Sequence, residues 1–151
     1  MVVEPMVRRP ARADGRTTQR GNGPGERTSE ADDPEPRGRR ALIVDDEPDI
    51  VDILASLLED VGWTPLPAFG PEDALRIAAA GPIDLLMCDI CMPRMDGIEL
   101  LRRMRLEAMI GDAPVVLMSA ARRIEPHGTV FLAKPFDLDE VVSLLDRLVA
   151  G

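Results

Sequence analysis

The order of apolar and polar residues along the chain changes at residue 41, where strand-like and helix-like patterns begin to alternate. Residues 41–44, ALIV, form a short apolar run rich in β-branched side chains, which is typical of a buried strand. Apolar residues then recur at helical spacing, at Ile50, Ile53, Leu54, Leu57, Leu58 and Val61. Pro48 suits the first turn of this predicted helix, and Gly62 ends it.

The same alternation continues toward the end of the chain. Residues 64–69, TPLPAF, predict a strand whose two prolines restrict it to a sheet edge. The later pattern predicts helices over 71–81 and 98–110 and strands over 83–88, 114–118 and 129–133. Asp137 and Glu140 form a capping box before a last helix. Strands that alternate with helices indicate an α/β fold, a parallel sheet with helices on both faces.

The connection between the fourth and fifth predicted strands is unusually short. Only nine residues, AARRIEPHG (120–128), separate Ser119 from the next strand. A parallel crossover that contains a helix needs at least about 10 to 12 residues, and Pro126 limits a helix further. We therefore predict that the fourth helix, between these two strands, is shortened or missing.

The first 40 residues differ in composition from the remainder. Residues 1–40 are rich in Arg, Gly and Pro and lack large apolar groups after Val7, so we predict a disordered tail. This segment carries nine Arg against seven acidic residues, net +2, whereas residues 41–151 are strongly acidic, with net −11. Because nucleic-acid binding depends on neutralising phosphates, the acidic part argues against direct nucleic-acid binding.

Two further expectations follow from what the sequence lacks. No apolar stretch reaches the roughly 18 to 20 residues that span a bilayer, and the N-terminus has no apolar signal core, which predicts no membrane insertion and a cytoplasmic location. The only cysteines, Cys88 and Cys91, form a C-x-x-C pair, but His127 is the only histidine, so a zinc site built from Cys and His cannot be completed. We expect ordinary buried or rim cysteines, with redox or metal use as the alternative.

Polar residues stand at the ends of four predicted strands: Asp45 and Asp46, Asp89, Ser119 and Lys134. In parallel α/β sheets the carboxyl ends of the strands meet at one edge, where binding sites form. The lysine is the only one in the chain, beside 17 arginines, and its compact charge differs from the wide guanidinium fork. These residues predict a polar site at that edge.

Three carboxylates at one edge need compensation. Two unit charges about 5 Å apart repel by roughly 3 kcal/mol at an effective dielectric constant near 20. Either a pKa rises or a cation binds, and a few carboxylates with water suit Mg²⁺. With a lysine and a hydroxyl nearby, such a site suits a phosphoryl group, which one carboxylate could accept as an aspartyl phosphate. Each residue alone has a simpler explanation, as a helix cap, a turn, a strand end or a solvated charge, but the combination favours the site.

The segments IVDDEPD, LLMCDICMPRMDGIELL, VVLMSA and FLAKPF resemble the receiver domain of bacterial two-component response regulators, of the stand-alone CheY-like type. The resemblance covers residues 41–150, so we assign 41–151 to this domain. It implies a flavodoxin-like, five-stranded sheet in the order 2-1-3-4-5. It also implies a phosphoprotein in a phosphorelay, fed by a histidine kinase or a histidine phosphotransfer protein.

The resemblance implies a role for each residue of the predicted site. Asp89 is the expected phosphoacceptor, and it is expected to bind Mg²⁺ together with Asp45, Asp46 and the main-chain carbonyl of Cys91. Ser119 and Phe131 are the expected switch residues, which respond to phosphorylation. Ser119 and Lys134 are also expected to contact the phosphoryl group. The peptide bond between Lys134 and Pro135 is expected to be cis.

Three functional hypotheses follow. The first is a single-domain response regulator, not an enzyme, because the chain ends at Gly151 directly after the last predicted helix. The second is a receiver-like protein-binding module that does not switch, because the short segment 120–128 alters the usual output face. The third is a Mg²⁺-dependent phosphatase, but its D-x-D signature is absent, since Cys91 stands two residues after Asp89.

Overall fold

The computed structural model describes residues 38–121 and 126–150. The tail predicted over residues 1–40 lies almost entirely outside the described residues. Within them, none of the helices is long and apolar enough to cross a membrane.

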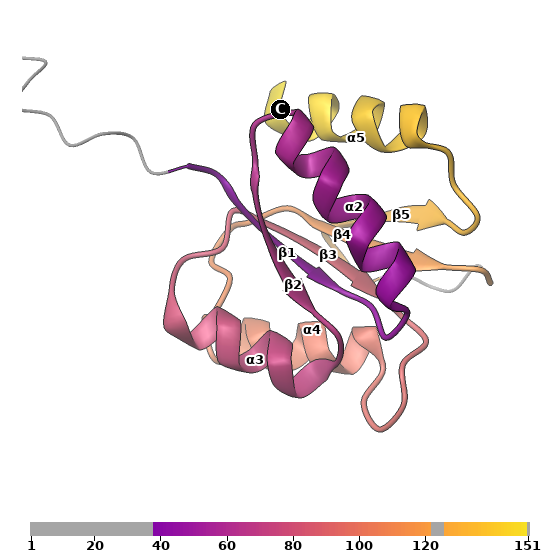
Figure 1. Cartoon of the computed structure of the whole chain (residues 1–151). Helices are drawn as coiled ribbons and strands as arrows, with labels where there is room; N and C mark the ends of the chain where they lie inside the picture. Colours follow the sequence, from indigo (N-terminus) through magenta and orange to yellow (C-terminus); the bar gives the residue numbers. More distant parts are fainter. Residues whose placement is uncertain (1–37, 122–125, 151) are drawn as a thin grey trace, which may run out of the picture. The chain divides into compact units, whose positions relative to one another are not determined.

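Five parallel strands form one sheet in the order β2-β1-β3-β4-β5, which confirms the predicted fold class (Figure 1). The strands are β1 (Arg40–Val44), β2 (Thr64–Ala68), β3 (Leu85–Asp89), β4 (Val115–Ser119) and β5 (Thr129–Ala133). β2 lies at an edge, as its prolines require, because proline cannot donate to a second neighbouring strand.

The described helices are α2 (Pro48–Asp60), α3 (Pro71–Ala80), α4 (Gly97–Leu106) and α5 (Leu138–Ala150). α2 and α5 cover one face of the sheet, and α3 and α4 cover the other (Figure 1). Successive strand residues point to opposite faces, so Leu42 and Leu86 pack under α3 and α4 while Ile43 and Met87 pack under α2 and α5. Each such fully buried side chain contributes about 1.5–3 kcal/mol to folding. The two apolar layers hold the strand ends in fixed positions.

Most predicted element boundaries match to within one residue, and two differ by more. The helix predicted over 98–110 ends at Leu106, because Ala108 adopts a left-handed conformation with φ 54°. The Ala108 N–H donates to the Arg105 carbonyl and the Met109 N–H to the Met104 carbonyl, as in a Schellman cap. The strand predicted over 83–88 begins only at Leu85.

The capping box at the start of α5 is confirmed. The Asp137 N–H donates to the Glu140 carboxylate at 3.1 Å, and the Glu140 N–H donates to the Asp137 carboxylate at 2.9 Å. Two N–H groups at the helix start are thereby satisfied, which fixes where the helix begins after the segment that carries Lys134.

The described residues between β4 and β5, 120–121 and 126–128, contain no helix, as predicted. Residues 122–125 lie outside the described part of the chain. On the α3 and α4 side of the sheet, Phe131 of β5 is only partly buried, although its partner Leu117 in β4 is fully buried. The outer strand is therefore less covered on this face than its neighbour.

Candidate functional site

The ends of four strands bring the predicted polar residues together at one edge of the sheet. Asp45 follows β1, Asp89 ends β3, Ser119 ends β4 and Lys134 follows β5. Asp45, Asp89 and Ser119 are the buried polar side chains of the described residues, with exposures of 0%, 4% and 1%. Buried polar groups need hydrogen-bonding partners, so these side chains form an organised site and are not simply solvated surface groups.

Three carboxylates lie close enough to bind one ion. Asp45, Asp46 and Asp89 each place an oxygen within 4.8 Å of the others. Asp45 and Asp89 are buried and Asp46 is exposed, so the cluster opens to solvent on one side. The Glu47 N–H donates to Asp45 at 2.9 Å, which fixes the buried carboxylate. Hard oxygen donors with an open side suit Mg²⁺, which keeps several water ligands.

Lys134 contacts two members of this cluster and the neighbouring Glu47. Its ammonium lies 2.7 Å from Asp45 Oδ2, 3.2 Å from Asp89 Oδ1 and 3.2 Å from Glu47 Oε1. Burial lowers the pKa of Lys134, but the hydrogen bond to Asp45 and the nearby carboxylate charges outweigh burial and raise this pKa overall. The side chain therefore remains a cation.

The backbone around Lys134 connects it to the neighbouring strand. Its N–H donates to the Ser119 carbonyl at 2.9 Å, which continues the pairing of β5 with β4. The peptide bond between Lys134 and Pro135 is cis.

The electrostatic environment raises the pKa of Asp89 from 3.8 to about 6. Burial is the largest cause, and the negative charge of Asp45 adds to it, while Lys134 acts in the opposite direction. A carboxylate whose charge is disfavoured in this way gains from a bound cation.

Gly97 is a site residue whose role was not predicted beyond opening a helix. A Cβ atom at this position would overlap the main-chain oxygen of Asp89, and the Gly97 N–H donates to the Ile90 carbonyl at 2.8 Å. Only glycine lets the start of α4 approach the chain this closely. Asp96 caps the same helix by accepting from the Glu99 N–H at 2.9 Å. The glycine after this aspartate was the available sequence signal.

Ser119 and the cysteines lie around the cluster. The Ser119 hydroxyl accepts from the Ala121 N–H at 3.1 Å and lies 3.9 Å from the Cys91 sulfur. Both cysteines are free thiols: Cys91 is exposed, and Cys88 is buried in the core, where burial raises its thiol pKa. One cysteine is thus buried and the other exposed, within the expectation of buried or rim cysteines.

The predicted switch residue Phe131 lies away from the carboxylate cluster. It pairs with Leu117, two positions before Ser119 in the neighbouring strand, and packs against the apolar layer beneath α3 and α4. Ser119 and Phe131 thus share one face of adjacent strands without direct pairing.

The sequence profile of the response regulator receiver domain matches residues 41–146. The chain belongs to the response regulator receiver domain family. The receiver domain of the hybrid histidine kinase CckA is 36% identical, with a TM-score of 0.66, over 73% of this chain and 98% of that one. TrrA from Thermotoga maritima, solved in complex with Mg²⁺ and BeF, is 30% identical with a TM-score of 0.64, over 73% and 98%.

A full-length relative places this receiver domain in bacterial signalling. RpaA of Synechocystis, described as a DNA-binding dual master transcriptional regulator, is 29% identical over 117 residues, which are 73% of this chain and 48% of RpaA. The chain thus spans about half the length of this relative. Receiver domains act in two-component systems with histidine kinases. Because RpaA is named as DNA-binding, our expectation of no direct nucleic-acid contact stays a prediction, as does the cytoplasmic location.

Proposed function

We propose that Asp89 accepts a phosphoryl group from the phosphohistidine of a histidine kinase or a histidine phosphotransfer protein. One carboxylate oxygen of Asp89 attacks phosphorus, the bond between phosphorus and the imidazole nitrogen breaks, and the imidazole keeps the electron pair. The products are an aspartyl phosphate and a free histidine. Asp89 suits this role because it is held at the end of a buried strand while its cluster opens to solvent.

The donor set fits Mg²⁺. Asp45, Asp46 and Asp89 would hold it, together with the main-chain carbonyl of Cys91, and the TrrA complex with Mg²⁺ and BeF supports the assignment. A bound Mg²⁺ supplies positive charge that offsets the three carboxylates and the oxygens of the incoming phosphoryl group.

Lys134 and Ser119 complete the proposed reaction site. The Lys134 ammonium, beside Asp89 Oδ1, is placed to stabilise negative charge on the transferred phosphoryl group. We infer that the Ser119 hydroxyl, at the end of the next strand, moves toward the same group once it is attached and donates to it. This movement of Ser119 would allow Phe131 to repack and would shift the domain between two conformations.

The observation that carries the proposal is the contact of one ammonium with both Asp45 and Asp89. The test is incubation of the chain with Mg²⁺ and acetyl phosphate, comparing the wild type with Asp89→Asn. Asp146→Asn, which changes an exposed carboxylate of α5, is the matched control. We expect labile phosphate on the wild type and the control only. Continuous release of phosphate with fast turnover would instead indicate a phosphatase.

A binding module that does not switch is the second candidate, because the described residues between β4 and β5 contain no helix. This segment lies between Ser119 and Phe131, the two proposed switch residues. Absence of labelling in the wild type, with an unchanged fold, would favour this candidate.

A further inference from the structure

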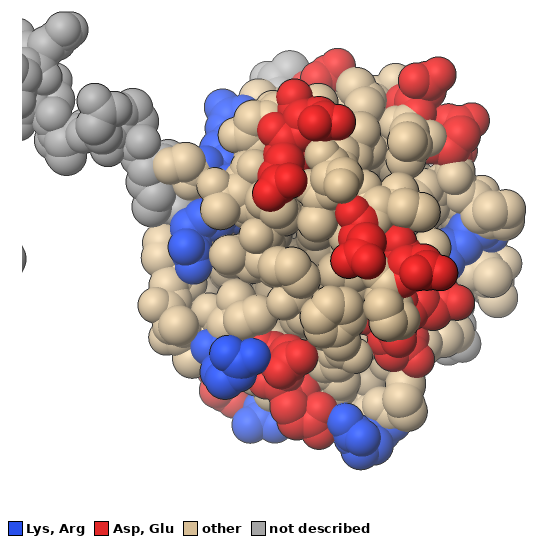
Figure 2. All heavy atoms as spheres, viewed as in Figure 1, with Lys and Arg blue, Asp and Glu red and all other residues tan. Residues whose placement is uncertain are grey.

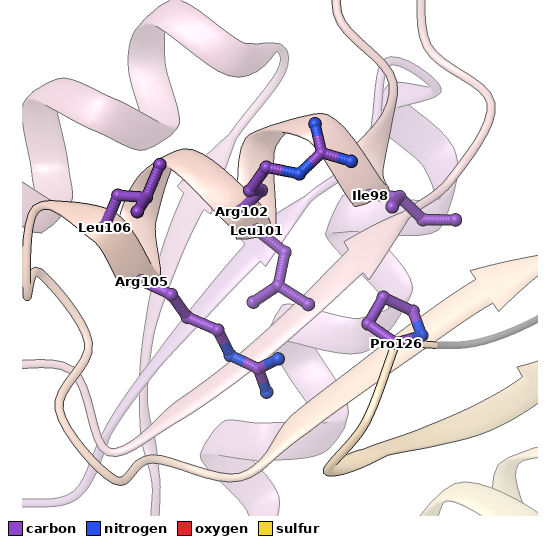
Figure 3. Close-up of a pocket in the computed structure, with 6 residues that line it drawn as sticks. All are labelled: Ile98, Leu101, Arg102, Arg105, Leu106 and Pro126. Atoms are coloured by element: carbon purple, nitrogen blue, oxygen red, sulfur yellow. The ribbon is translucent and has the colours of Figure 1, made fainter.

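An apolar pocket lies between α4 and the connection from β4 to β5, and none of its lining residues belongs to the carboxylate cluster. Its volume is ≈ 300 Å³, and it is lined by Ile98, Leu101, Arg102, Arg105, Leu106 and Pro126 (Figure 3). We call this pocket and its lining the α4 groove. Leu106 at its end is 79% exposed, which is unusual for a leucine that follows a buried helical stripe.

The α4 groove lies where the chain passes from β4 to β5. Pro126 belongs to this connection, and the Arg105 guanidinium donates to the carbonyl of the next residue, His127, at 3.0 Å. The described residues of the connection contain no helix to cover α4 from this side. Among the described residues, Leu106 of this groove is the most exposed large apolar side chain.

The charge on α4 differs from that on the other described helices. α4 has three arginines against one glutamate, net +2, whereas α2 has net −4, α3 net −1 and α5 net −2. Figure 2 shows acidic side chains over α2 and α5, and neighbouring acidic and basic side chains at the lower edge of the view, over α3. The bond of Arg105 to a neutral carbonyl leaves the charge of this guanidinium in place. Arg102 and Arg103 form ion pairs with Glu99 and Glu107. The groove thus combines an apolar floor with the positive charge of Arg105, which pairs with no carboxylate of the described residues.

We propose that the α4 groove binds an amphipathic helix of another protein. An apolar side chain of that helix enters the pocket, and an Asp or Glu residue beside it lies against Arg105. Helices bind grooves in this way when apolar anchors at i, i+3 and i+4 meet a matching apolar floor, and the flanking charges select the partner. The partner helix then covers the apolar side chains that no helix of the described connection covers.

The charge distribution argues against a second copy of this chain as the occupant. The strongly acidic helix of the same chain, α2, lies on the opposite face of the sheet from α4. Pairing α4 of one copy with α2 of the next would be head-to-tail and would leave each end open to further copies. Pairing α4 with α4 would place like charges together. An acidic helix of a different protein would complement the charge of the groove. It would cause neither open-ended association of copies nor a contact between like charges.

The binding test uses synthetic peptides of about 18 residues, long enough for a stable amphipathic helix. The first peptide repeats Leu on one face with Glu on both flanks. The second replaces each Glu by Lys, and the third replaces each Leu by Ser. Binding is followed by NMR chemical-shift changes of the full chain without Mg²⁺ or phosphodonor, so the result does not depend on phosphorylation of Asp89.

We expect the Leu/Glu peptide alone to shift the amides of α4. Arg105→Glu and Leu106→Ser should each weaken this binding by about tenfold. Arg76→Glu on α3 changes another exposed arginine, outside the groove, and should leave binding unchanged. Thermal unfolding verifies that each variant is folded, and Leu106→Ser alters a side chain with little burial.

Several results would overturn the proposal. The Leu/Glu peptide could leave the α4 amides unshifted, or the Lys peptide could bind as tightly as the Leu/Glu peptide. Arg105→Glu could bind the Leu/Glu peptide as tightly as the wild type does. Self-association of the chain could block the peptide. Sedimentation at the NMR concentration distinguishes the last of these from the others.

Discussion

The ammonium of Lys134 lies 2.7 Å from the fully buried carboxylate of Asp45, although 89 positions separate the two residues in the sequence. The contact connects the end of β1 with the end of β5, across the ends of β3 and β4. The same ammonium also contacts Asp89. One lysine therefore compensates a buried charge and lies beside the proposed phosphoacceptor, so its replacement should affect both stability and labelling.

Lys134→Ala should destabilise the chain by about 3 kcal/mol at pH 7, because removing one partner leaves the buried Asp45 charge without its closest cation. Urea unfolding followed by circular dichroism measures the change. The double variant Lys134→Ala/Asp45→Asn should recover part of the loss, since both charges are then removed. A loss below about 0.5 kcal/mol in the single variant would contradict the role of this contact.

Lys134→Arg should fold more stably than Lys134→Ala and still accept phosphate poorly. The guanidinium keeps the charge, but its planar fork cannot place a point charge beside Asp89 in the same way. The rate of labelling by acetyl phosphate, measured for folded protein only, is the relevant quantity. Labelling at the wild-type rate would show that position 134 needs a positive charge and no particular geometry.

Asp89 should make the metal-free protein less stable as the pH rises from about 4 to about 7. Its native pKa is raised from 3.8 to about 6, so in this range the native state keeps a proton that the unfolded state has released. Stability falls with pH wherever the native state binds more protons, here by up to about 3 kcal/mol from this group. The measurement is the difference in unfolding free energy between wild type and Asp89→Asn.

That difference should grow with pH in favour of Asp89→Asn, and millimolar Mg²⁺ should reverse much of it in the wild type only. A difference that is constant between pH 4 and pH 7 would mean that Asp89 ionises normally in the folded protein.

Gly97→Ala should destabilise the chain by about 1–3 kcal/mol and slow labelling, because a Cβ atom there would push against the Asp89 main chain. The matched control is Gly70→Ala, at the start of α3, where the nearest atom to a new Cβ is a flexible Glu72 oxygen at 3.8 Å. We expect the control to change stability by less than about 1 kcal/mol. Equal effects of the two variants would show that the approach of α4 to Asp89 is not important.

The main features of the site could be predicted because they depend on topology. Parallel strands place their carboxyl ends at one edge, so residues directly after strands, such as Asp45 and Lys134, had to meet there. A shortened or missing helix between β4 and β5 could be predicted from chain length, since nine residues do not accommodate a full crossover helix, and the described residues there contain none.

Other features depend on contacts that have no local pattern. The approach of Gly97 to the Asp89 carbonyl and the contact of Glu47 with Lys134 arise only once the elements are packed. The end of α4 at Leu106 depends on a left-handed alanine, Ala108, a conformation that the sequence gives no reason to expect at an alanine. The α4 groove could not be predicted, because it arises only when α4 packs beside Pro126, 20 or more positions later in the sequence.

Phe131 should respond to occupation of the site. Mg²⁺ with beryllofluoride, an analogue of the attached phosphoryl group, should change amide hydrogen exchange in β5, and Ser119→Ala should abolish the change. Exchange in β2, at the opposite edge of the sheet, is the internal control. If β5 exchanges identically in both conditions while beryllofluoride binds, the chain acts as a binding module without this switch.

The most direct test of the central claim is to locate the phosphoryl group after reaction with Mg²⁺ and a phosphodonor. Borohydride converts an aspartyl phosphate to homoserine, which peptide mass spectrometry identifies at its position. We predict homoserine at position 89 and at none of Asp45, Asp46 or the remaining aspartates. Homoserine at another position, or none in folded wild-type protein, would contradict the account.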